Sequence, residues 1–305
     1  MRIYFIVKLC SEGNFKILLL MKRHMGEVMK EIKIWKMILI YLGTSFLVIF
    51  GVTIYSFVKG TQEINDLYLS FVLSLSVLLV TLMSGRVGIK LAKERFNNFK
   101  KVDSIKEIII VVATQIFLSI GLSNLSLGFV AINDKNKALE VANETFGNPT
   151  NNIELVIFLI SVVIIAPLLE EIIFRRIVFK RLNMRFSFTI SAIVSSLVFG
   201  IGHEFLGILG AIVFGVACCL LYIKYNNLLV PITVHVVNNL LSGVFTSISY
   251  FNGSLNEKVS VITNFDIKMN FVSGTILTAI TLIIFIRFIN ANKQYIKTNK
   301  SRLQI

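Results

Sequence analysis

Two adjacent glutamates interrupt an otherwise apolar part of the chain. Glu170 and Glu171 lie in the stretch APLLEEIIFRR, residues 166–176, directly after the apolar run IELVIFLISVVII. A charged side chain at the centre of a membrane helix costs about 3 kcal/mol or more, so such residues are rare and usually face a bundle interior or a water-filled cavity. The two acids are therefore candidates for a functional role.

Helical spacing separates the roles of the two acids. Side chains four residues apart share a face of a helix, whereas adjacent ones do not. Glu171 and Arg175 are four apart, so they can pair and neutralise each other. Glu170 points about a quarter-turn away. We therefore expect Glu170 to lack that partner, as a working carboxylate requires.

Two of the three histidines of the chain lie in other apolar runs. His203 ends the stretch FGIGH, four residues after Phe199, so the two rings should pack together. His235 begins the stretch HVVNN and lies four residues before Asn239. An imidazole and an amide should thus project together into one cavity.

These side chains could together hydrolyse a peptide bond. A carboxylate and an imidazole can share a water molecule and remove its proton, and an imidazole and an amide on a facing helix can stabilise the developing oxyanion. The simpler interpretation is structural, because a Glu–Arg pair or a single polar side chain often only joins two membrane helices. The near-absence of other strongly polar residues in these runs favours function. Ser242 and Cys218 have no spacing that suggests a nucleophile.

The composition is that of a multi-pass membrane protein. Of its 305 residues, 55% are hydrophobic and only 16% charged, and the mean hydropathy is +0.78, whereas soluble domains have about 25% charged residues. The net charge of +14 is explained by basic cytoplasmic loops, so no nucleic-acid partner is expected. The three cysteines form no CxxC pair.

Apolar runs of about 20 residues, long enough to cross a bilayer, predict an all-α, polytopic helix bundle. Its eight transmembrane helices lie near residues 34–58, 67–85, 107–130, 153–174, 187–203, 205–223, 228–250 and 271–289. The fifth and sixth runs are short, and six spans with a re-entrant pair is the alternative.

The distribution of basic residues predicts the orientation of the bundle. Of the 31 Lys and Arg, all but Lys59, Lys135, Lys137, Lys258 and Lys268 lie on the side of the two termini. Positive charge is enriched in cytoplasmic loops, so both termini should be cytoplasmic. On this topology His203 ends a helix that starts on the cytoplasmic side. Glu170 and His235, by contrast, lie in the cytoplasmic half of the membrane. The fifth span must then be short or tilted, or the site must lie deeper in the membrane.

The chain divides into three regions. Residues 1–33 form a cytoplasmic segment, in which Met21, Met25 and Met29 are candidate later starts. Residues 34–290 form the membrane domain, and residues 291–305 form a basic cytoplasmic tail. We expect the protein to reside in a bacterial plasma membrane.

Three motifs resemble those of a known family. They are EExxxR from Glu170 to Arg175, FxxxH from Phe199 to His203, and HxxxN from His235 to Asn239, in this order on the fourth, fifth and seventh predicted membrane helices. Together they resemble the CPBP family of intramembrane proteases, which includes CAAX prenyl endopeptidases of the Rce1 type and bacterial Abi proteins linked to bacteriocin processing and immunity. The resemblance covers about residues 150–250.

The resemblance implies a role for each motif residue. Glu170 would act as general base together with His203, and His235 and Asn239 would stabilise the oxyanion. Glu171 and Arg175 would form a supporting pair. The expected mechanism uses no cofactor. A zinc ion held by Glu170, His203 and His235, with an open fourth position, is the alternative.

The predicted function is that of an intramembrane endopeptidase in contact with the lipid bilayer. Its substrate would be a peptide or a membrane-associated peptide, such as a pheromone or bacteriocin precursor, and bacteriocin self-immunity is a related role. One alternative is a proton-coupled transporter in which Glu170 and the histidines form a relay, although the chain has no second half with matching acids. Another is a catalytically silent membrane scaffold.

Overall fold

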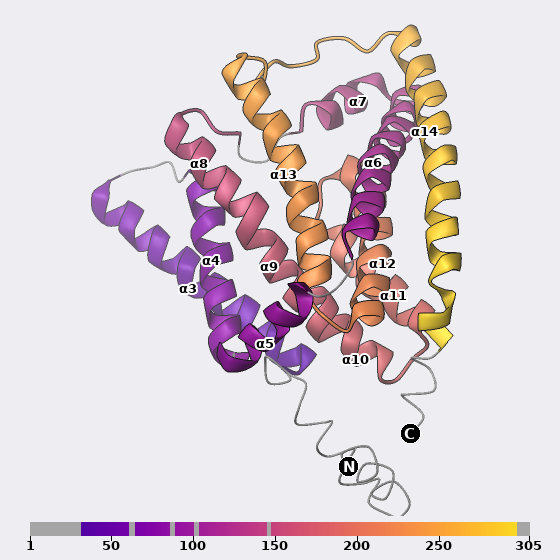
Figure 1. Cartoon of the computed structure of the whole chain (residues 1–305). Helices are drawn as coiled ribbons and strands as arrows, with labels where there is room; N and C mark the ends of the chain where they lie inside the picture. Colours follow the sequence, from indigo (N-terminus) through magenta and orange to yellow (C-terminus); the bar gives the residue numbers. More distant parts are fainter. Residues whose placement is uncertain (1–31, 61–64, 86–88, 101–103, 145–147, 298–305) are drawn as a thin grey trace, which may run out of the picture.

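The protein is a bundle of α-helices. The computed structural model describes residues 32–60, 65–85, 89–100, 104–144 and 148–297, and these contain no β-strand (Figure 1). Most of the predicted N-terminal segment and the last eight residues of the basic tail lie outside the described residues.

The described residues contain all eight of the predicted apolar helices. They are α3 (Ile34–Lys59), α4 (Asp66–Gly85), α6 (Ile105–Asn133), the composite helix α8–α10 (Asn152–Asn183), α11 (Phe188–Ile201), α12 (Ile208–Tyr225), α13 (Leu229–Phe251) and α14 (Asn264–Ala291). Seven are long and apolar enough to cross a membrane, α12 being counted with the short 3₁₀ helix η3 (Phe205–Gly207) that precedes it. Helix α11 is the shorter apolar helix, so the fifth run is short, as the sequence indicated.

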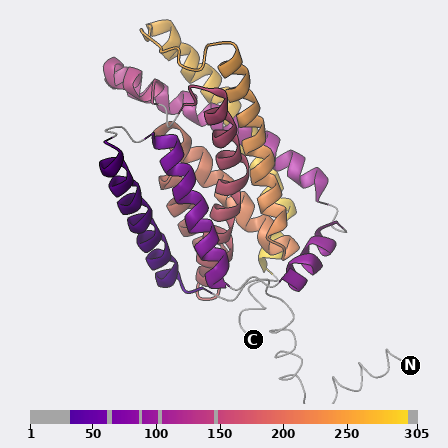
Figure 2. The same cartoon turned by 90° about the vertical axis from the view of Figure 1, so that its left-hand side faces the viewer.

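Two further helices lie at opposite ends of the bundle and were not expected (Figures 1 and 2). Helix α5 (Ile89–Lys100) lies at the end where α3 begins and α14 ends, and α7 (Lys135–Ala142) lies at the other end. The Arg95 Nη1 of α5 donates a hydrogen bond of 2.9 Å to the Asn226 carbonyl, and Asn227 Nδ2 donates one of 3.1 Å to the Arg95 carbonyl. These bonds attach α5 to the connection between α12 and α13.

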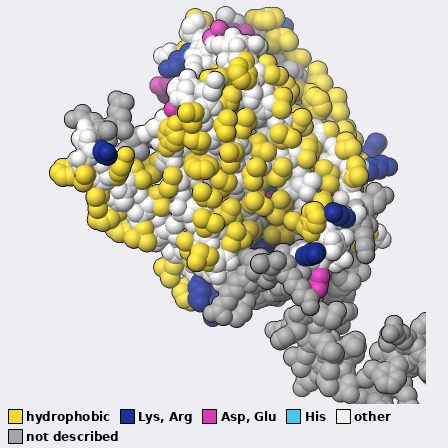
Figure 3. Space-filling model, turned by 60° about the vertical axis from the view of Figure 1, so that its left-hand side comes forward, with side chains coloured by type: hydrophobic (Ala, Val, Ile, Leu, Met, Phe, Trp, Pro, Cys, Tyr) yellow, Lys and Arg dark blue, Asp and Glu magenta, His cyan; other side chains and the backbone are white. Residues whose placement is uncertain are grey.

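The outer surface of the bundle is apolar. Large side chains such as Leu47 and Phe57 are 68% and 88% exposed, and hydrophobic side chains cover most of the face in Figure 3. Such an extensive apolar exterior is unfavourable in water and favourable in lipid. The chain is therefore a multi-pass membrane protein. The side on which its termini lie stays a prediction.

The fourth membrane helix is irregular where it carries the two acids. It runs through α8 (Asn152–Ile160), the π-helix η1 (Ser161–Ile165), α9 (Ala166–Glu170), the π-helix η2 (Glu171–Phe179) and α10 (Lys180–Asn183). π-Helical turns are rare and are frequent at functional sites. The two acids lie at the junction of α9 and η2, and the sequence signal for this irregularity is Pro167.

Helix α6 positions the connection that follows α11. Its Gln115 Nε2 donates a hydrogen bond of 2.9 Å to the Gly210 carbonyl, and its Ser123 Oγ donates one of 2.9 Å to the Leu206 carbonyl. Both acceptors lie in the segment that leads into or begins α12. These bonds fix the backbone directly after His203.

Candidate active site

The buried ion pair predicted from spacing is present. Arg175 Nε lies 3.0 Å from Glu171 Oε2, and both side chains are 0% exposed. The Arg175 guanidinium also lies over the Phe199 ring, 4.7 Å from its centroid. A buried charge is tolerated when an opposite charge and polarisable neighbours surround it, so this pair can persist in the bundle interior.

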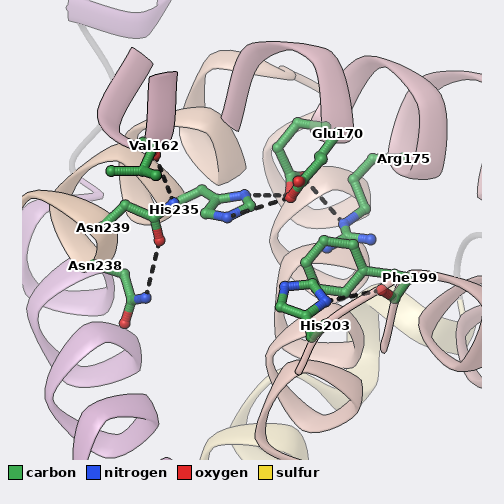
Figure 4. A network of polar contacts seen from close by, with 9 residues as sticks. Val162, Glu170, Arg175, Phe199, His203, His235, Asn238 and Asn239 are labelled. Carbon is green, nitrogen blue, oxygen red and sulfur yellow. Dashed lines mark hydrogen bonds and ion pairs between the residues drawn. The ribbon is translucent and has the colours of Figure 1, made fainter. Parts of the chain in front are cut away.

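His235 lies between the two carboxylates. Its Nδ1 is 3.1 Å from Glu171 Oε1, and its Nε2 is 3.6 Å from Glu170 Oε2, as Figure 4 shows. The ring is packed edge-on against Phe214, with centroids 5.0 Å apart. Glu170 does not pair with Arg175, as the helical spacing predicted. Instead, the imidazole of His235 on α13 lies beside it, and spacing within one helix gave no indication of this neighbour.

His203 follows the end of α11, and its side chain contacts the last turn of that helix. Its Nδ1 lies 3.0 Å from the Phe199 carbonyl, and the two rings meet edge-to-face with centroids 4.7 Å apart. A carbonyl oxygen can only accept, so Nδ1 donates this bond, and in the neutral ring Nε2 is then the acceptor. The predicted packing of the two rings is confirmed. Nε2 is the nitrogen that can take a proton from water.

Glu170 and His203 line the same cavity. It has a volume of about 620 Å³ and is bounded mainly by apolar side chains of α3, α4, η2 and α11. On the α3 side its wall includes Ile38, Tyr41 and Leu42, which are 53%, 45% and 59% exposed. The cavity thus reaches the lipid-facing surface of the bundle. It brings together an acid and a base from two helices far apart in the sequence.

Asn239 does not line this cavity with them. Its Nδ2 donates a hydrogen bond of 2.7 Å to the Val162 carbonyl of η1, and its Oδ1 accepts one of 3.3 Å from Asn238 Nδ2. His235 is likewise absent from the lining of the cavity, and only 5% of its side chain is exposed. The spacing rule placed both side chains on one face of α13, but it did not identify their partners. Their role at an oxyanion stays a prediction.

The described residues do not form a metal centre. No three His, Cys, Asp or Glu side chains within these ranges converge in a way that could hold a metal ion. The alternative zinc ligands Glu170 and His235 are close to each other, whereas His203 contacts the end of its own helix. The described residues therefore do not fit a resident metal ion.

The comparisons with known proteins concern the part of the chain that forms this site. Residues 152–241, from the start of α8 to the middle of α13, match the family of type II CAAX prenyl endopeptidases described as Rce1-like. These residues, about 30% of the chain, are called the Rce1-like segment for the family that they resemble. All three motifs lie inside this Rce1-like segment, and the resemblance inferred from them is confirmed there.

Two curated relatives match over nearly the same length. The membrane-embedded CAAX protease MroQ of Staphylococcus aureus (strain USA300) is 39% identical over 90 residues, which cover 27% of this chain and 36% of MroQ. YdiL of Bacillus subtilis (strain 168), a candidate membrane peptidase, is 38% identical over 77 residues, which cover 25% of this chain and 32% of YdiL. The match thus spans about a third of each relative. No solved structure matches the chain significantly.

Proposed function

We propose that this protein is an intramembrane endopeptidase that hydrolyses an apolar or membrane-associated peptide without a cofactor. The observation that carries the proposal is the shared cavity of Glu170 and His203, which is apolar in its walls and reaches the lipid-facing surface. The Rce1-like segment and its relatives, one of them a CAAX protease by name, support the same reaction class.

In the proposed reaction, a water molecule lies in the cavity between the Glu170 carboxylate and His203 Nε2. Glu170 takes a proton as the water oxygen attacks the peptide carbonyl, which forms a tetrahedral oxyanion. His235 Nδ1 donates to the Glu171 carboxylate, so Nε2 carries a hydrogen only in the imidazolium form. In that form Nε2, which lies 3.6 Å from Glu170 Oε2 and outside ordinary hydrogen-bond range, donates to the oxyanion. The C–N bond then breaks, and the proton held by Glu170 passes to the leaving amine.

The two glutamates differ in their partners and in their exposure to the cavity. Glu171 forms an ion pair with Arg175 and accepts a hydrogen bond from His235 Nδ1, so it orients the imidazole. Glu170 is partly exposed to the cavity, with 29% of its side chain accessible. The acid with fewer partners is thus the one that faces the space for substrate and water.

The test is peptide cleavage by the purified protein in proteoliposomes. Internally quenched apolar peptides, and peptides encoded beside its gene as candidate pheromone or bacteriocin precursors, would serve as probes. We expect Glu170→Gln and His203→Ala each to lower the cleavage rate at least about 100-fold, the usual contribution of a general base. Glu140→Gln, the same change on the exposed surface of α7, should leave the rate unchanged.

Two outcomes would overturn the assignment. Full cleavage by the folded Glu170→Gln or His203→Ala variant would remove that residue from the mechanism. Loss of cleavage with a chelator, restored by zinc, would replace the cofactor-free reaction with the metal alternative.

A proton-coupled transporter is a second candidate, favoured by the cluster of Glu170, His235 and Glu171 inside the bundle. Ionisable side chains clustered within a membrane protein occur in the proton relays of pumps and transporters. Proton-driven uptake into the same proteoliposomes, lost in Glu170→Gln and without any cleavage of the peptides, would favour it over the peptidase.

A further inference from the structure

The backbone of the fourth membrane helix has a defect just before Glu170. In an α-helix the Val162 carbonyl accepts from the N–H of Ala166, four residues later. Here the Ala166 N–H donates to the Ser161 carbonyl, five residues earlier. The next nitrogen, five residues after Val162, belongs to Pro167, which has no N–H. The helix therefore offers the Val162 carbonyl no backbone donor in either register.

The side chain of Asn239 supplies the missing donor. Its Nδ2 lies 2.7 Å from the Val162 carbonyl oxygen, and the close-up in Figure 4 shows this bond between α13 and the fourth helix. A carbonyl without a donor is costly in an apolar interior, and side chains of neighbouring helices commonly bond the groups that a proline frees. The bond thus compensates a defect created by Pro167.

Two neighbouring residues on α13 favour the bond from Asn239 to Val162. Gly243, one turn after Asn239, faces the same helix, where an added Cβ would lie 2.8 Å from Leu159 Cδ2. The absence of a side chain there lets α13 approach closely enough for a short amide to reach the backbone. Asn238 Nδ2 donates to Asn239 Oδ1 at 3.3 Å, which turns the amide so that Nδ2 faces Val162.

We propose that Asn239 is a positioning residue that acts as the substitute backbone donor for Pro167. By joining α13 to η1 it fixes α9, which carries Glu170, relative to His235, one turn earlier on α13. Its effect on catalysis, which rests on the proposed function, is then transmitted through Val162. This role differs from the direct contact with an oxyanion that the family resemblance assigns to it.

A double-mutant cycle between positions 239 and 167 tests the proposal. Asn239→Leu removes the donor, whereas Pro167→Ala provides an N–H five residues after Val162. We expect Asn239→Leu to lower the melting temperature in lipid nanodiscs by several degrees and the cleavage rate of the quenched peptides at least tenfold. Adding Pro167→Ala should recover most of both losses. Asn239→Gln, which keeps an amide, should recover part of them.

The matched control is Asn124→Leu. Asn124 is also a half-buried amide that joins two helices, because its Nδ2 donates a hydrogen bond of 3.0 Å to Ser273 Oγ. Any melting temperature lost in Asn124→Leu should not be recovered by Pro167→Ala, since this amide does not contact the fourth helix. Equal recovery in both backgrounds would make Pro167→Ala a general stabiliser and would overturn the proposal.

The melting temperatures keep this test separate from that of the proposed function, because they need no substrate. A double variant no more stable than Asn239→Leu, or no better folded where Asn239→Leu fails to fold, would overturn the coupling. Recovery of stability without recovery of cleavage would show that Asn239 contacts the reacting atoms, and would overturn positioning as its role. A wild-type protein without cleavage but with the expected coupling would overturn only the peptidase.

Discussion

At the scale of single residues, the Arg175 guanidinium is the group whose burial is hardest to compensate. It is 0% exposed and its ionic partner is Glu171, which also holds His235. Desolvating such a pair is expensive, and the attraction between its members repays that cost only in a good geometry. The pair therefore contributes most by orienting His235, not by adding stability relative to an apolar core.

Removing one member of the Glu171–Arg175 pair should therefore lower the free energy of unfolding more than removing both. Glu171→Gln leaves the Arg175 charge buried without its counter-ion, so the free energy of unfolding should fall by about 3–5 kcal/mol. Adding Arg175→Met removes the stranded charge and should recover much of that loss. Thermal or denaturant unfolding in detergent micelles would measure both variants. A double variant less stable than Glu171→Gln would contradict the prediction.

At the scale of elements, the short helix α11 decides where His203 lies. Its 14 residues extend about 21 Å, whereas the hydrocarbon core of a bilayer is about 30 Å thick. The helix therefore ends inside the bundle, and the bonds from Gln115 and Ser123 hold the segment that follows. His203 is thereby held beside the cavity that Glu170 also lines.

The close packing of α11 against α12 can be tested at Gly200, inside the FxxxH motif. A Cβ at this position would lie 2.5 Å from Ile212 Cγ1 and 3.1 Å from the Ile208 carbonyl oxygen. Gly200→Ala must push the helices apart, so the free energy of unfolding should fall by about 1–3 kcal/mol, and peptide cleavage should fall with it because His203 moves.

The matched control is Gly43→Ala on α3, where nothing lies within 4 Å of the added Cβ. It should leave both quantities unchanged or slightly raised, since alanine is the better helix former. Equal behaviour of the two variants would contradict the packing argument.

At the scale of the whole molecule, the bundle encloses a cavity that α3 closes on one side. Figure 2 shows α3 at the edge of the bundle beside α4, and its packing partner is mainly that helix. The α3 side chains that line the cavity are also exposed on the outer surface. A substrate in the lipid phase would therefore meet α3 before it reached Glu170 and His203.

A bulky side chain on the inner face of α3 should block the proposed substrate without unfolding the protein. Ile38 lines the cavity, whereas its neighbour Leu39 is 59% exposed and does not line it. We expect Ile38→Trp to lower kcat/KM for the quenched peptides at least about tenfold at an unchanged melting temperature. Leu39→Trp should change neither. A normal kcat/KM in Ile38→Trp would place substrate binding elsewhere.

The features that could be predicted correctly from the sequence are those that depend on local geometry. Hydropathy gave the eight apolar helices, and four-residue spacing gave the Glu171–Arg175 pair and the packing of Phe199 on His203. These features need only the geometry of one helix. The three motifs also located the Rce1-like segment, because all three lie within residues 152–241.

Only the tertiary structure decided what lies between helices. The position of His235 between two carboxylates, the bond from Asn239 to Val162 and the cavity shared by Glu170 and His203 all join segments far apart in sequence. Helical periodicity gives the face of a side chain but not the helix that packs against this face. The packing of eight helices fixes those partners, and with them the chemistry that the site can perform.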